Sequence, residues 1–376
     1  MTKLFAYVCL FLYLRSSPLV RSICFDKQPL SQTSPAGGNL ELQGVPPSPT
    51  EQKQLNELLT AAKIDTSKIK FQRVSSNAAF CNQVFYVQER KDSSNLAVAK
   101  LFSELALMRV DPLVQLGEVD RWVTRNQPNL VSRVLASNEA GILFEYFPGK
   151  ALSGIDLCRR NVTFECHLVG SSLARLHAVP PPPLPKTISR PHMLWRSCNT
   201  MLDNISNSNR YRKDSQIVPG WTLSRLEKAV TLHKKSLESL DCPPALVDVG
   251  HGDFKPANIL IDANRITLID FELAGLQYRA FDLAKYVRSD RPKTKDFQQN
   301  TRSFYNGYIE TYSKLLGESL DIEVLENEVA SLMPMTWLEA AIFFACQIYQ
   351  GNCTRDQQDH WRLLASDRLA HYEECL

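Results

Sequence analysis

One segment of this 376-residue chain constrains the fold most strongly: VGHGDFKPANILIDANRITLIDFELAGLQYRAFD, residues 249–282. It contains H-x-D-x-x-x-x-N, formed by His251, Asp253 and Asn258, and Asp270 follows twelve residues after Asn258. Two β-rich runs lie between Asn258 and Asp270, separated by Asp-Ala-Asn-Arg, which is typical of a hairpin turn. Because a hairpin brings its open ends together, the spacing predicts that Asn258 and Asp270 face one cleft.

These residues are the types that phosphoryl transfer to a hydroxyl group requires, because that reaction depends on positioning and charge neutralisation. We expect Asp253 to accept or orient the substrate hydroxyl proton. We expect Asn258 and Asp270 to hold Mg²⁺, which prefers hard oxygen ligands. Lys255 is expected to contact the transferred phosphate of ATP. An ordinary polar loop before a hairpin is the alternative, although the complete set is rare by chance.

The texture of the chain changes between residues 67–147 and residues 148–376. The first part holds the strand-like runs KFQRV, NQVFYV, LAVAKLF, LVSRVLA and GILFEYF. Pro112 is expected to open one helix that runs to about Val123 and ends before the next proline. The second part is mainly helical. This α+β pattern, an antiparallel sheet with one helix followed by a larger helical lobe, predicts a two-lobed protein-kinase-like fold.

Several residues of the first part are candidates for ATP binding. Lys100 ends an apolar strand and is expected to reach the phosphates, with Glu118 as its acidic partner and Asp120 as the second choice. Asn82 follows a polar turn that lacks the pattern G-x-G-x-x-G, so a plain hairpin loop is an equally good interpretation. Glu145 begins EYFPG, whose backbone is expected to face adenine; a simple link between lobes is the alternative.

The chain resembles the choline/ethanolamine kinases, within the wider aminoglycoside-phosphotransferase-like group, over about residues 68–374. The most specific match is IDFELAGLQYRAFDLAKY, against a family pattern of roughly I-D-[FY]-E-Y-A-x-x-N-Y-x-x-F-D-[IL]-[GA]-N-H. AAFCNQVFYV, LFEYFPGKAL and LARLH support it. The resemblance implies that Asp253 is the catalytic base, that Asn258 and Asp270 bind magnesium, and that Glu272 lies beside the metal and the substrate amine.

The resemblance also implies structural roles for His251 and Asp282, with Asp282 bracing the catalytic loop. Tyr278, Phe343 and Tyr349 are the candidate aromatics of the substrate pocket, and ordinary helix core is the alternative for each.

Two departures from the family pattern concern the substrate cation. N-H-F-x-E becomes KYVRS at residues 285–289, so an expected acidic residue is missing unless Asp290 substitutes. Where members often carry W-G-L-W-S-I, this chain has FFACQI, so Phe343 replaces one ring whereas Cys346 does not replace the other. A quaternary ammonium favours an aromatic cage. Ethanolamine is therefore expected to be at least as good a substrate as choline.

The expected function is that of an ATP- and Mg²⁺-dependent kinase for ethanolamine or choline in phospholipid head-group synthesis. A kinase for another cationic hydroxyl compound, of the aminoglycoside or thiamine type, is the first alternative. A nucleotide-binding pseudokinase is the second, and the intact Asp253, Asn258, Asp270 and Lys100 argue against it.

Composition and the N-terminal end limit partners and location. The net charge of +3 is too mild to indicate nucleic acid, and no apolar run reaches the length of a membrane span. Residues 1–22, with the apolar run Leu4–Leu14, resemble a targeting segment, and residues 23–66 are expected to form a disordered leader. The need for ATP favours the cytoplasm, with an organelle or the endoplasmic reticulum as the alternative. The oligomeric state stays open, a homodimer being one option.

Overall fold

The computed structural model describes residues 46–74, 82–110, 117–152, 156–183, 190–211, 216–289, 293–349 and 353–376, all within the unit Leu42–Leu376. Its helices are α2 (Pro49–Ala61), α3 (Glu104–Arg109), α4 (Glu118–Asn126), α5 (Thr163–His177), α6 (Met193–Asn207), α7 (Leu223–Glu238), α8 (Arg279–Val287), α9 (Lys295–Leu316), α10 (Ile322–Ile348) and α11 (Arg355–Glu374). Its strands are β1 (Ile69–Arg73), β2 (Gln83–Glu89), β3 (Asn95–Leu101), β4 (Val134–Ser137), β5 (Gly141–Glu145), β6 (Lys150–Ala151), β7 (Leu246–Gly250), β8 (Ile259–Asp262), β9 (Arg265–Leu268) and β10 (Gly275–Tyr278).

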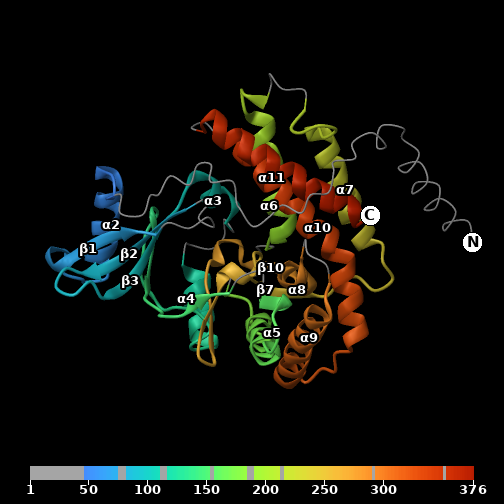
Figure 1. Ribbon diagram of the computed structural model, residues 1–376, viewed down its shortest axis with the longest axis horizontal. Helices are drawn as coiled ribbons and strands as arrows, with labels where there is room; N and C mark the ends of the chain where they lie inside the picture. The colour runs from blue at the N-terminus through green and yellow to red at the C-terminus, as the bar shows by residue number, and fades with distance from the viewer. Residues whose placement is uncertain are drawn as a thin grey trace, which may run out of the picture. The chain divides into compact units, whose positions relative to one another are not determined.

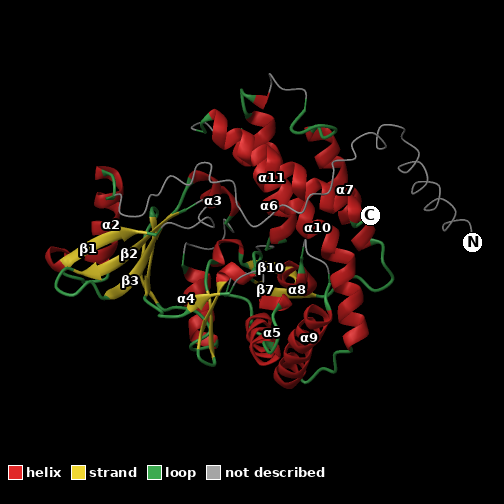
Figure 2. Cartoon of the chain, in the orientation of Figure 1, coloured by secondary structure: helices red, strands yellow, loops and turns green. Residues whose placement is uncertain are grey.

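The N-terminal sheet has the order β1-β2-β3-β5-β4, with every neighbouring pair antiparallel. Figure 2 shows its strands in yellow, with β1, β2 and β3 labelled. The predicted five-stranded sheet and the two-lobed α+β fold are thus confirmed. Side chains alternate along β3, so that Ala97, Ala99 and Leu101 are buried in the small core of this sheet. Lys100, between two of them, points to the opposite face and is available to the cleft.

The expectation of a disordered leader through residue 66 is wrong for its last part, because α2 is a well-formed helix. Ser48 and Glu51 form a capping box, in which the Glu51 backbone N–H donates to Ser48 Oγ at 3.3 Å and the Ser48 backbone N–H donates to Glu51 Oε2 at 2.7 Å. Leu55, Leu58 and Leu59 are fully buried in the core of the N-terminal sheet. Helix α2 lies beside the strands of this sheet (Figure 1). The pattern S-P-T-E preceding an apolar run was the signal for this helix.

The helix expected from Pro112 differs in its start. Pro112 lies outside the described residues, and α4 begins at Glu118, directly after Gly117. Gly117 has φ of 79°, a left-handed conformation that glycine adopts without steric cost. The short helix α3, capped by Ser103, was not expected from the sequence.

The C-terminal lobe is built on two groups of helices. Helices α5 and α9 lie side by side (Figure 1), and their close approach depends on Gly170 and Gly307. A Cβ atom on Gly170 would lie 2.0 Å from the backbone oxygen of Phe304. Helix α10 packs against α8 and α11. It is apolar and long enough to cross a membrane by composition alone, but 72% of its most apolar window is buried within the protein, as in an interior helix.

Candidate active site

The backbone of the loop that carries Asp253 is hydrogen-bonded to Asp282, a residue of α8 whose side chain is fully buried. Its carboxylate accepts hydrogen bonds from the backbone N–H groups of His251 at 2.6 Å and Gly252 at 2.8 Å. The Nε2 atom of His177 lies 3.1 Å from the same carboxylate. Gly252 has φ of 79°, and a Cβ there would lie 2.3 Å from the backbone oxygen of Leu273. The loop therefore has one tightly packed conformation, as a bracing role of Asp282 requires.

Asp253 is surrounded by donors. Its Oδ2 accepts from Lys255 Nζ at 2.7 Å and from Asn258 Nδ2 at 3.2 Å, and its Oδ1 accepts from Lys285 Nζ at 3.1 Å. Burial alone would raise the pKa of Asp253, but Lys255 and Lys285 hold it well below its usual range. Asp253 is therefore an ionised carboxylate of fixed orientation, suited to accept a hydrogen bond from a hydroxyl group.

The predicted hairpin between Asn258 and Asp270 is confirmed: β8 and β9 pair from Ile259↔Leu268 to Asp262↔Arg265. At its open end, the Ile269 N–H donates to the backbone oxygen of Asn258 at 3.0 Å. Asp270 has φ of 74°, a left-handed conformation that Asp tolerates better than most residues.

The donor atoms of Asn258 and Asp270 fit a magnesium ion. The Asn258 amide nitrogen donates to Asp253, which leaves its carbonyl oxygen for a ligand. Asp270 contributes a carboxylate that is part-exposed to the cleft. Within the described ranges, no cluster of three or more His, Cys, Asp or Glu side chains forms a complete protein cage. Magnesium is commonly held by one or two carboxylates together with substrate phosphates and water, so this donor set is of the appropriate kind.

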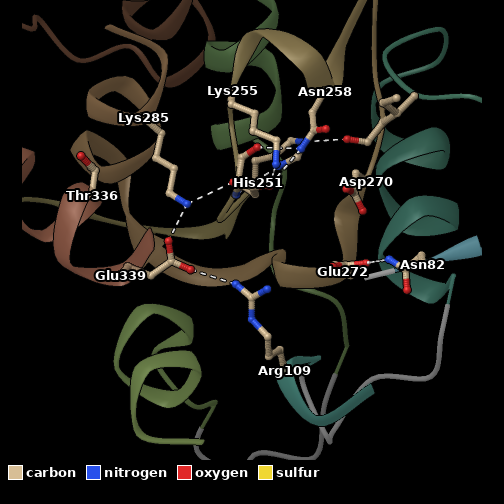
Figure 3. A network of polar contacts seen from close by, with 12 residues as sticks. Asn82, Arg109, His251, Lys255, Asn258, Asp270, Glu272, Lys285, Thr336 and Glu339 are labelled. Atoms are coloured by element: carbon tan, nitrogen blue, oxygen red, sulfur yellow. Dashed lines mark hydrogen bonds and ion pairs between the residues drawn. The ribbon is translucent and has the colours of Figure 1, made fainter. Parts of the chain in front are cut away.

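Lys100 crosses from the N-terminal sheet to this cleft. Its Nζ contacts Asp270 and lies 2.6 Å from Glu272 Oε2. Asn82 donates to the same Glu272 oxygen at 2.7 Å, a contact drawn in Figure 3. Burial would lower the pKa of Lys100, but the two carboxylates raise it. Burial and the neighbouring Asp270 raise the pKa of Glu272. The structure thus brings together four predicted site residues: Lys100, Asn82, Asp270 and Glu272.

Residues 71–373 of this chain match the choline/ethanolamine kinase family model. The chain belongs to the choline/ethanolamine kinase family. This confirms the predicted resemblance and the predicted enzyme class, a phosphotransferase with an alcohol group as acceptor. Probable choline kinase 3 of Arabidopsis thaliana is 25% identical over 276 residues, which is 67% of this chain and 72% of that protein. Ethanolamine kinase 2 of Mus musculus is 27% identical over 54% of this chain and about half of its own length, 48%.

Solved structures share the fold at low sequence identity. A choline kinase from Cryptosporidium parvum has a TM-score of 0.60 at 15% identity, covering 83% of this chain and 90% of its own. An ethanolamine kinase from Plasmodium vivax has a TM-score of 0.59 at 17% identity, covering 82% and 83%. These likenesses support the two-lobed kinase-like fold.

Glu118, the expected partner of Lys100, pairs with Arg121 in this structure, and Lys100 pairs with Asp270 and Glu272. Glu118 is 41% exposed in its side chain and forms an ion pair with Arg121 at 2.8 Å on the same helix. Asp120, the second choice, is buried, and burial raises its pKa to about 6, while Lys100 acts in the opposite direction. Asp120 is therefore the acidic residue of α4 whose pKa the charge of Lys100 lowers.

Glu145 lies at the end of β5, exposed, and its carboxylate pairs with Arg133 at 3.2 Å. The Tyr146 N–H donates to the backbone oxygen of Leu96 at 3.2 Å, which fixes the start of the linker between the lobes. Contact between this backbone and adenine remains a prediction.

The candidate pocket aromatics lie in different surroundings. Tyr278 is buried against His192, with ring centroids 4.4 Å apart, and Tyr349 is buried against Tyr211. Both are buried in the protein core, Tyr278 at the end of β10 and Tyr349 directly after α10. Phe343 is part-buried, and the Arg109 guanidinium lies over its ring at 5.0 Å.

Three residues to which the sequence analysis gave no site role form a chain of ion pairs that begins at Asp253, which Lys285 contacts. Lys285 Nζ lies 2.7 Å from Glu339 Oε2, and Arg109 Nη2 lies 2.8 Å from Glu339 Oε1. A small pocket of about 10 Å³, room for about one water molecule, is lined in part by Glu339 and Gly252. Lys285 was noted only as a departure from the family pattern. Arg109 and Glu339 are 230 positions apart, and no local pattern links them.

Proposed function

We propose that this chain is an ATP- and magnesium-dependent kinase that phosphorylates the hydroxyl of ethanolamine or choline in phospholipid head-group synthesis. The observation that carries the proposal is the convergence of Asp253, Asn258 and Asp270 around one hairpin, with Lys100 reaching Asp270 from the other lobe. Family membership supports the same reaction class.

Each residue has a role that its contacts support. Asp253 orients the acceptor hydroxyl and receives its proton, because its carboxylate is ionised and held on both oxygens. Asn258 and Asp270 would hold magnesium, which when bound neutralises charge on the ATP phosphates. Lys100 and Lys255 would contact phosphate oxygens once the nucleotide replaces their present carboxylate partners. Glu272, paired with Lys100 and Asn82, lies at the metal side.

Ethanolamine is proposed ahead of choline. Of the three candidate rings, Tyr278 and Tyr349 are buried in the core, and Cys346, fully buried, offers no ring. A quaternary ammonium therefore lacks the aromatic cage that binds it best. A primary amine relies on hydrogen bonds instead.

We also propose that the lobes divide near residue 147 and that the enzyme acts where ATP is plentiful, with the cytoplasm as the expected location. Residues 1–22, the expected targeting segment, lie outside the described residues.

A substrate panel tests the proposal directly. The purified chain is incubated with MgATP and, separately, ethanolamine, choline, thiamine and an aminoglycoside, and the phosphorylated product is measured. We expect turnover of ethanolamine and weaker turnover of choline. Asp253→Ala is expected to abolish transfer while ATP binding persists. Robust phosphorylation of thiamine or the aminoglycoside alone would refute the substrate assignment, and full activity of Asp253→Ala would refute the base.

A further inference from the structure

Two buried cations of the protein, Lys285 and Arg109, lie on the side of Asp253 that faces away from Asn258 and Asp270, which we call the acceptor side. Lys285, with a side chain only 4% exposed, bridges Asp253 Oδ1 at 3.1 Å and Glu339 Oε2 at 2.7 Å (Figure 3). Arg109, 6% exposed, pairs with the other Glu339 oxygen at 2.8 Å, and its Nε donates to Ser197 Oγ at 3.1 Å. We call Arg109, Lys285 and Glu339 the acceptor-side cluster. It connects the catalytic carboxylate to α3, α8 and α10.

The protein supplies more positive than negative charge among the groups that contact Asp253 and Glu339. Asp253 and Glu339 supply two negative charges, and Lys255, Lys285 and Arg109 supply three positive charges. Burial would raise the pKa of Glu339, but Lys285 and Arg109 lower it, so this carboxylate stays ionised and paired. No surplus negative charge therefore remains beside Asp253 to attract a cationic acceptor.

The aromatic faces of the region are covered as well. The Arg109 guanidinium carbon lies 5.0 Å from the centre of the Phe343 ring, and Lys285 Nζ lies 5.3 Å from the centre of the Phe281 ring. Both distances are within the range of a cation–π interaction. An incoming ammonium ion would have to displace a buried protein cation from each ring.

We propose that Arg109 and Lys285 act as internal cations that make this site discriminate against acceptors with a permanent positive charge. The inference rests on the proposed function and deepens it. A quaternary ammonium keeps its charge at every pH and has no N–H to donate. A primary amine can bind as the neutral base, because neighbouring cations lower an amine pKa.

The experiment compares kcat/KM for ethanolamine and choline in the wild type and in Arg109→Met, which removes one internal cation and leaves Glu339 paired with Lys285. We expect kcat/KM of the wild type to be at least about tenfold higher for ethanolamine than for choline. In Arg109→Met this ratio is expected to fall about tenfold, because the Phe343 ring loses its protein cation and becomes available to the ammonium group of choline. Arg109→Lys keeps the charge and is expected to stay within about threefold of the wild-type ratio.

Arg225→Met is the matched control. Arg225 also lies over an aromatic ring, Trp221 at 3.9 Å, and pairs with a carboxylate, Glu373 at 2.8 Å, but on the surface of the helical lobe. The ratio of kcat/KM for ethanolamine to kcat/KM for choline in Arg225→Met is expected to equal that of the wild type. An unchanged ratio in a folded Arg109→Met, or a wild type that prefers choline, would overturn the inference.

A measurement on the wild type keeps the inference testable if Arg109→Met does not fold. The KM for ethanolamine is expected to fall by up to about a hundredfold from about pH 7 to about pH 9, because the neutral fraction of an alkyl amine rises about tenfold per pH unit below its pKa, whereas the KM for choline stays constant. Equal pH dependence for both acceptors would overturn the inference while leaving the kinase activity established. Phosphorylation of neither acceptor at any pH would overturn the proposed function and this inference together.

Discussion

The two sides of the cleft differ in their balance of charge. On the metal side, Lys100 is the cation that Asp270 and Glu272 share, one positive charge for two carboxylates. On the acceptor side, three cations contact the two carboxylates of Asp253 and Glu339. A magnesium ion bound on the metal side would supply the positive charge that is missing there. The acceptor side has no such deficit, so the two halves of the cleft differ in the charge that they present to a ligand.

The pKa directions follow the same division. Glu272 and Asp253 are both buried carboxylates, yet the pKa of Glu272 is raised by burial and by Asp270, whereas that of Asp253 is held down by Lys255 and Lys285. Burial raises both, so the neighbouring charges decide the direction.

Removal of a carboxylate from the metal side should have the largest effect. Asp270→Asn keeps the shape of the side chain but removes the anionic magnesium ligand, and we expect kcat to fall by about a thousandfold or more. Asp262→Asn, at the exposed turn of the same hairpin, is the matched control and should retain full activity. Steady-state kinetics at varied magnesium concentration measure both. Undiminished turnover of Asp270→Asn would remove the basis for a metal at this side.

Removal of a cation from the acceptor side should have a smaller effect, seen in kcat rather than in nucleotide affinity. Lys285→Met leaves Asp253 Oδ1 without its donor, so we expect kcat to fall about 10- to 100-fold with ATP affinity unchanged. Because Lys285 holds the pKa of Asp253 down, its loss raises that pKa, and the acid limb of the kcat profile moves to higher pH. Lys285→Arg should recover part of the lost kcat and move the acid limb of the kcat profile back toward its wild-type pH.

The matched control for Lys285→Met is Lys234→Met, which breaks an exposed pair with Glu238 at 3.9 Å on one face of α7. Its kinetics should equal those of the wild type. A Lys285→Met enzyme with a normal acid limb and a raised KM for ATP would assign Lys285 to the nucleotide side instead.

The metal side was largely predictable from the sequence, and the acceptor side was not. Asn258 and Asp270 flank a single hairpin, so local spacing alone determines that they meet. The pairing of Glu118 with Arg121 rather than Lys100 has a geometric cause: two residues apart on a helix, Glu118 and Asp120 point in nearly opposite directions, and the sequence does not reveal the rotation of α4. Contact between Arg109 and Glu339 joins distant helices and depends on tertiary packing that no local pattern encodes.

Asp120 extends the carboxylate surplus of the metal side, and its charge should cost stability. Its pKa of about 6 lies above the unfolded value of about 3.9, so folding stability falls as pH rises from about 4 to about 6. Asp120→Asn should therefore stabilise the metal-free protein by about 1–3 kcal/mol at pH 7 and change little at pH 4. Thermal unfolding at the two pH values measures this. A destabilised variant at pH 7 would mean that the Lys100 attraction outweighs the burial cost.

The smallest effect is expected at Glu118, which tests where the metal side ends. Glu118 is part-exposed and pairs with Arg121 on its own helix, and exposed pairs of this kind contribute about 0–1 kcal/mol. Glu118→Gln should change ATP affinity by less than about twofold and the Tm by at most about 1 °C. Nucleotide titration in the presence of magnesium measures the affinity. A tenfold loss of affinity would show that α4 rotates when ATP binds and brings Glu118 to Lys100, so that the carboxylate surplus of the metal side would include one residue more.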